Sequence, residues 1–134
     1  MSAAGARHPL HARRRLAWKD TVRFPWIVPP ERSPMRASLE AAFAQAGLGM
    51  PAAVMSSASI LINKALAQQS DCLFVASLNV LRELEQAEPD AVRHLPLYVP
   101  HVAPGVGMLW VDDATPGVAV LMDALRIAPR RIQN

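Results

Sequence analysis

Residues 22–47, VRFPWIVPPERSPMRASLEAAFAQAG, place a strand pattern directly before a helix pattern. The first part is a short apolar run that ends in two prolines, and proline cannot continue a strand ladder. Ser33 and Pro34 then have the composition of a helix start, a serine N-cap followed by a proline in the first turn. Apolar residues recur on one helical face until Gly47. The stretch therefore predicts a strand at 22–28 and a helix beginning at Pro34.

The same order of strand, serine and helix recurs along the rest of the chain. Alternation of this kind is typical of a parallel sheet with helices on its faces, which places the chain in the α/β class. The further expected elements are strands at 52–55 and 72–76, a helix at 60–68, strands at 95–99 and 106–111, and a helix at 116–127. A further helix is expected after Ser77 or Asn79, running through Leu81, Leu84 and Ala87 and stopped by Pro89.

Length and cysteine content limit what the chain can be. Its 134 residues correspond to about one domain, and 51% of them are hydrophobic, which is enough for a packed core. The single cysteine, Cys72, excludes an internal disulfide framework. No apolar run is long enough to cross a membrane, so no membrane association is expected.

Charge is distributed unevenly along the chain. Residues 1–36 carry a net charge of +6, residues 37–125 a net charge of −6, and residues 126–134 a net charge of +3. The basic character therefore belongs to the two ends, and the body is acidic. This distribution does not favour a continuous basic surface that would bind nucleic acid.

Residues 1–19 contain four arginines, one lysine and no acid, and three interpretations compete. An organelle transit peptide is one, and a basic tail that contacts nucleic acid or membrane is another. The third is a plain lead-in to the domain. Pro9 interrupts the stretch and its leucines form no apolar stripe, so we expect a basic, mostly irregular lead-in.

Hydroxyl and amide side chains follow three successive predicted strands. In an open parallel sheet these junctions meet at the edge where ligands bind, and the helix N-termini there favour an anion. The sequence thus predicts a small polar or anionic ligand at this edge. The competing interpretation is that each residue is an ordinary helix cap. The residues concerned are Ser33, then Ser56, Ser57 and Ser59, then Ser77 and Asn79.

Motifs for other chemistry are missing from the sequence. It has no nucleophile elbow, no zinc-protease motif, no Gly-rich phosphate loop and no dinucleotide fingerprint. His8 and His11 lack acidic or cysteine neighbours, so no metal site is expected. Asp112 and Asp113 precede a predicted helix start, where acids favour the helix dipole. We therefore expect no enzyme, no catalytic residue and no cofactor.

An ordered set of stretches resembles the effector-binding domain of LysR-type transcriptional regulators. No single motif is specific, but the set extends over residues 8–127. The matching stretches are His8-Pro9-Leu10, the run from Phe24 to Pro30, Ser33-Pro34-Met35-Arg36, Val54-Met55-Ser56-Ser57, the run from Ser70 to Val75, Leu95-Pro96, the run from Val106 to Leu109, and the segment from Thr115-Pro116 to Arg126.

The resemblance implies an incomplete, type 2 periplasmic-binding-protein-like fold built around a parallel-sheet βαβαβ subdomain. It divides the chain into the lead-in at 1–19, a second effector subdomain at 20–103, and a return strand and terminal helix of the first subdomain at 104–127. Residues 128–134 form a basic tail. The chain would be a truncated regulator that lacks the family's DNA-binding winged helix-turn-helix.

Function also follows from the resemblance. It implies sensing of a small metabolite, with Ser33, Ser56 and Ser57 at the positions that contact the effector. The full-length family acts in the cytoplasm as homo-oligomers, and DNA would be bound only through the domain absent here. Two alternatives stay open: a free-standing solute-binding module of the same fold, and a small α/β enzyme.

Overall fold

The computed structural model describes residues 1–100 together with residues 117, 120, 123 and 124. The chain divides into two compact units, Met1–Ala103 and Pro104–Asn134. The four described residues of the second unit are helical and exposed. The expected strand at 106–111 and most of the expected helix at 116–127 lie outside the described residues.

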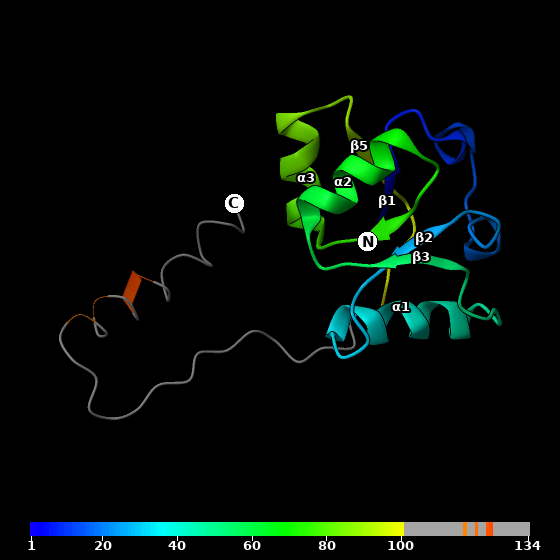
Figure 1. The fold of residues 1–134 in the computed structure, drawn as a ribbon, viewed down its shortest axis with the longest axis horizontal. Coiled ribbons are helices and arrows are strands. Elements are labelled where there is room, and N and C mark those ends of the chain that lie inside the picture. Colours follow the sequence, from blue (N-terminus) through cyan, green and yellow to red (C-terminus); the bar gives the residue numbers. More distant parts are fainter. Residues whose placement is uncertain (101–116, 118–119, 121–122, 125–134) are drawn as a thin grey trace. The chain divides into compact units, whose positions relative to one another are not determined.

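The described part of the first unit is a mixed α/β structure (Figure 1). Within the described part of the chain, no helix has both the length and the apolar character needed to cross a membrane. In chain order the elements are β1 (Ser2–Gly5), the 3-10 helices η1 (Pro9–Ala12) and η2 (Trp18–Asp20), β2 (Trp26–Val28), α1 (Pro34–Gln45), β3 (Ala53–Ser56), α2 (Ile60–Gln69), β4 (Phe74–Val75), α3 (Leu78–Ala87) and β5 (Val92–Leu95).

A serine caps the N-terminus of each of α1, α2 and α3, as the sequence predicts. The hydroxyl of each N-cap serine accepts a hydrogen bond from the backbone N–H three residues later, which satisfies one of the free donors of the first turn. The three pairs are Ser33 with Arg36 at 3.2 Å, Ser59 with Ile62 at 3.4 Å, and Ser77 with Val80 at 3.4 Å. Gly47 follows α1 with a φ of 70°, a left-handed conformation that glycine adopts without strain.

The strands form two small sheets that meet at one bridge. β2 and β3 are parallel, and a parallel bridge joins Trp26 of β2 to Leu73, just before β4. In the other sheet β1 lies between β4 and β5 and is antiparallel to both. The prediction of parallel pairing is thus confirmed for β2 and β3, whereas β1, where no strand was predicted, adds antiparallel pairing.

The N-terminal strand is the main correction to the sequence analysis. Residues 1–19 were expected to be mostly irregular, yet β1 is fully buried and pairs on both edges. Its sequence, Ser-Ala-Ala-Gly, has little intrinsic preference for a strand. The strand forms because β4 and β5 supply hydrogen-bond partners on both sides, and because small side chains fit between the layers that cover it.

Among the predicted strands, β2 and β5 begin furthest from their expected first residues. β2 begins at Trp26 instead of residue 22, because η2 and a turn occupy the preceding residues. β5 begins three residues earlier than the expected strand at 95–99, since its register is set by the pairing of Val92 with Gly5 of β1. The first difference has a local cause, whereas the second arises from a pairing partner that is distant in the sequence.

Successive strand residues point into two different core clusters. α1 lies on one side of the strands and α2 and α3 lie on the other (Figure 1). The alternation therefore shows a sheet covered on both faces, as the continuous apolar strand at 72–76 predicts. The cluster toward α1 contains Ala4, Leu10, Trp26, Val28, Leu39, Phe43, Leu73, Val75 and Leu95. The cluster toward α2 and α3 contains Ala3, Ile27, Ala67, Cys72, Phe74, Leu81 and Val92.

Candidate functional site

A hollow of about 250 Å³ lies where β2, β3 and β4 give way to the helices that follow them. Parallel strands place these junctions at one edge of the sheet, and that edge is where ligands bind in α/β folds. The hollow will be called the junction hollow. It is lined by Pro29, Pro30, Ser33, Met35, Ser57, Ala58, Ile60, Asn63, Val75, Ala76 and Val80.

Ser33 and Ser57 come together in the junction hollow although 24 positions separate them in the sequence. Ser33 Oγ accepts from the backbone N–H of Arg36, and Ser57 Oγ accepts from the backbone N–H of Ser59 at 3.1 Å. Neither hydroxyl proton has an acceptor among the described residues. Each serine can therefore donate a hydrogen bond into the hollow while its oxygen remains engaged with the backbone.

Ser56 lies elsewhere. It is the last residue of β3, its side chain is exposed, and it borders a different hollow together with Glu31 and Arg36. Ser57 lies just beyond the end of β3, at the junction with α2, and lines the junction hollow instead. The structure thus brings two of the three predicted site residues together and leaves the third outside.

Asn63 also lines the junction hollow and was not among the predicted site residues. It lies in the first turn of α2, where its backbone N–H donates to Ser59. Only 5% of the residue is exposed, and its Oδ1 has no hydrogen-bond partner among the described residues. The sequence does carry a signal for this residue. Asn63 lies at helical spacing from Ile60 and Ala67 on the core-facing side of α2, and a buried asparagine needs hydrogen-bond partners.

Backbone dipoles, not charged side chains, set the electrostatic potential at the junction hollow. None of the described residues that line it carries a charged side chain, and the N-termini of α1 and α2 lie beside it with their caps at Ser33 and Ser59. The positive ends of two helix dipoles favour an anion or a hydrogen-bond acceptor. The rest of the lining is apolar, so the hollow suits a small molecule with an acidic or polar end and an apolar body.

A second, apolar hollow of about 270 Å³ adjoins the first. The two share Met35 and Ala76, and the second extends past Leu78 to Tyr98 and Val99. Tyr98 is 71% exposed, an unusual degree for a large aromatic side chain. The pair of hollows gives the sheet edge a polar part and an apolar part.

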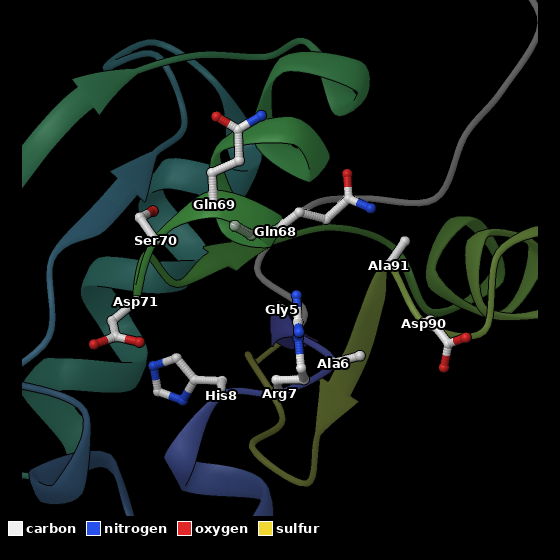
Figure 2. Close-up of a pocket in the computed structure, with 11 residues that line it drawn as sticks. Gly5, Ala6, Arg7, His8, Gln68, Gln69, Ser70, Asp71, Asp90 and Ala91 are labelled. Atoms are coloured by element: carbon white, nitrogen blue, oxygen red, sulfur yellow. The ribbon is translucent and has the colours of Figure 1, made fainter.

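A third hollow, of about 280 Å³, lies by the Gly5 end of β1 (Figure 2). Ser2 at the other end of β1 pairs with Val75, so this hollow lies away from the carboxyl end of β4. His8 and Asp71 lie near each other there in Figure 2. Burial lowers the pKa of His8 and outweighs the opposing effect of Asp71, so the imidazole is neutral near pH 7.

The described residues include no group of three or more histidine, cysteine or acidic side chains placed to hold a metal ion. His8 and His11 make ring contact at 6.4 Å between centroids. Each also contacts the local backbone, His8 through the N–H of Leu10 and His11 through the carbonyl of Gly5. These contacts give both histidines a structural role.

Comparison with known proteins gives one family and one informative relative. The model of the LysR substrate binding domain family matches residues 2–129. A protein of Pseudomonas putida strain KT2440 named HTH-type transcriptional regulator GalR is 31% identical over 122 residues. The alignment covers 89% of this chain and 30% of that protein. The chain thus spans about 30% of the length of the relative it matches.

Proposed function

The chain belongs to the LysR substrate-binding domain family, a family of non-enzymatic, effector-binding domains, and from this premise we propose that it senses a small metabolite at the junction hollow. The observation that carries the proposal is the convergence of Ser33 and Ser57 from two different strand-to-helix junctions. Each presents a hydroxyl proton that has no acceptor within the described residues.

The expected effector has a carboxylate or a similar acceptor at one end. Two hydroxyl donors and the N-termini of α1 and α2 would hold that end. The apolar lining around Val75 and Val80 would cover its body. Ser56 remains a predicted effector contact. Because it lines a different hollow, its replacement can be compared with that of Ser57 in the same experiment.

The proposal extends to the regulator of which such a domain is a part. The family model accounts for residues 2–129, so operator DNA would be bound by a part of the regulator outside these residues. We propose that the regulator acts as a homo-oligomer in the cytoplasm, where its DNA lies. The match to a transcriptional regulator supports this view.

Binding of small carboxylic acids to the 134-residue chain tests the proposal. We expect some acids to raise the thermal unfolding midpoint, because a ligand that binds only the folded state stabilises it. Ser57→Ala should weaken their binding roughly 10-fold or more, since a hydrogen bond to a charged group contributes about 1.5–3 kcal/mol.

Ser59→Ala is the matched control, because it removes a helix cap without removing a residue that lines the junction hollow. It should cost about 1 kcal/mol of stability and leave acid binding unchanged. Equal affinities in wild type and Ser57→Ala would contradict the proposed site. The Ser56→Ala variant shows whether that residue contributes as well.

A further inference from the structure

The side chain of Asn63 is enclosed and has no hydrogen-bond partner among the described residues. The residue is 5% exposed, and its Oδ1 is fully buried without a hydrogen bond to any described residue. Its side-chain amide makes no hydrogen bond within the part of the chain that the structure describes. Its backbone N–H donates to the carbonyl of Ser59 at 3.0 Å.

A buried amide without a hydrogen-bond partner lowers the stability of the fold when no ligand is bound. Burying a polar group without a partner costs about 1–3 kcal/mol, whereas an apolar residue of similar size at the same place would cost nothing of this kind. α2 has no structural need for asparagine there, since its first turn is already capped by Ser59. Because Asn63 lines the junction hollow, a molecule that enters the hollow is the partner available to this amide.

The junction hollow offers a ligand both hydrogen-bond donors and a hydrogen-bond acceptor, and these come from different residues. Ser33 and Ser57 offer hydroxyl donors beside helix N-termini, which suits an acidic group. Asn63 Oδ1 is an acceptor, so it requires a donor from the ligand, and a carboxylate has none. One ligand meets both demands only if it carries a hydrogen-bond donor in addition to its acid group. A neutral hydroxyl fits this donor better than an ammonium group, because no acidic side chain among the described residues lines the hollow and the adjacent helix N-termini disfavour a cation.

We propose that Asn63 is a specificity-determining residue that selects hydroxylated acids over the corresponding unsubstituted acids. The inference rests on the proposed function, because it concerns the same hollow. The hydroxyl donates to Asn63 Oδ1, the acid group accepts from Ser33 and Ser57, and an apolar chain packs against Met35, Ile60 and Val80.

Four acids with one carbon skeleton test this inference: hexanoate and its α-hydroxy, β-hydroxy and ω-hydroxy derivatives. Isothermal titration of the whole chain measures each affinity. We expect at least one hydroxy acid to bind roughly 10-fold more tightly than hexanoate, the value of one additional buried hydrogen bond. In Asn63→Leu, that hydroxy acid and hexanoate should bind equally.

Asn79→Leu is the matched control, because it makes the same replacement at an exposed site in α3 that does not line the hollow. It should preserve the preference for the hydroxy acid. Asn63→Ala, which removes the amide without adding volume, should lose the preference in the same way as Asn63→Leu.

The unliganded proteins give a second readout. Removing an unpartnered buried amide should raise or preserve the thermal midpoint of Asn63→Leu, whereas a purely structural asparagine predicts a lower midpoint. A lower midpoint together with an unchanged hydroxyl preference would overturn the inference.

Failure of the inference can be told apart from failure of the proposed function. If hexanoate and all three hydroxy acids bind wild type equally while Ser57→Ala still weakens them, the role of Asn63 is wrong and the site stands. If none of the four acids binds but another small acid raises the unfolding midpoint of wild type more than that of Ser57→Ala, only the inference is contradicted. If no small acid binds, both are contradicted.

Discussion

His8 shows how one buried imidazole organises the chain between β1 and η1. Its Nδ1 accepts from the backbone N–H of Leu10 at 3.1 Å and so acts as the N-cap of η1. Its ring packs edge-on against Phe24, with 4.5 Å between centroids. A ring that accepts at Nδ1 must be neutral there, which agrees with the lowered pKa that burial gives it.

This arrangement predicts a loss of stability in mild acid. Burial lowers the pKa of His8 and of His11, so the folded chain binds protons less readily than the unfolded chain, whose histidines titrate near about 6.5. Stability is therefore complete above about pH 6.5 and falls as the pH drops toward the lowered folded-state values. The urea midpoint should be lower at about pH 5.5 than at about pH 7.5.

His8→Asn is the variant that isolates the effect. Asparagine is a good N-cap but does not titrate, so the bond to Leu10 can remain while the proton linkage of this site disappears. The decline between the two pH values should become smaller in this variant. An equal decline in wild type and His8→Asn would show that His8 does not cause it.

The packing of β1 against α2 depends on Gly5. A Cβ built on Gly5 would overlap the carbonyl oxygen of Ala67, near the end of α2. The close approach of strand and helix therefore needs a residue without a side chain. Because the obstacle is backbone rather than a flexible side chain, it cannot be relieved by a change of rotamer.

Gly5→Ala should destabilise the protein by roughly 1–3 kcal/mol, the usual cost of forcing extra volume into a packed interior. Chemical denaturation monitored by tryptophan fluorescence measures the loss. Gly49→Ala is the control, since nothing lies within 4 Å of the position its Cβ would occupy. A Gly5→Ala protein as stable as Gly49→Ala would mean that α2 moves away from β1 without cost.

The described first unit is held together by a sheet with a core on each face. β1 joins the two edges of its sheet and contributes Ala4 to the cluster toward α1 and Ala3 to the cluster toward α2 and α3. The aromatic residues Trp18, Trp26 and Phe43 contact one another, so the N-terminal segment is tied to α1 as well. The N-terminal residues are thus part of the core.

Ala4→Asp tests this integration of the N-terminus. Ala4 is 0% exposed, and an unpaired carboxylate there would cost several kcal/mol, a large fraction of typical domain stability. We expect loss of cooperative thermal unfolding. Ala65→Asp, at an exposed position of α2, should fold and lose only about 0.7 kcal/mol of helix propensity. Cooperative unfolding of Ala4→Asp near the wild-type midpoint would argue against a buried β1.

Local signals in the sequence determined the three helices, the parallel pair β2 and β3, and the placement of Ser33 and Ser57 at strand-to-helix junctions. Serine caps, proline in the first turn and helical periodicity act within a few residues, so they can be recognised in the sequence without knowledge of the tertiary structure. Only the tertiary structure decided the strand at Ser2–Gly5, the register of β5 and the partnerless burial of Asn63. Each of these depends on partners far away along the chain. A poor strand former becomes a strand when both of its edges are paired, and a buried amide is unsatisfied only because of what surrounds it.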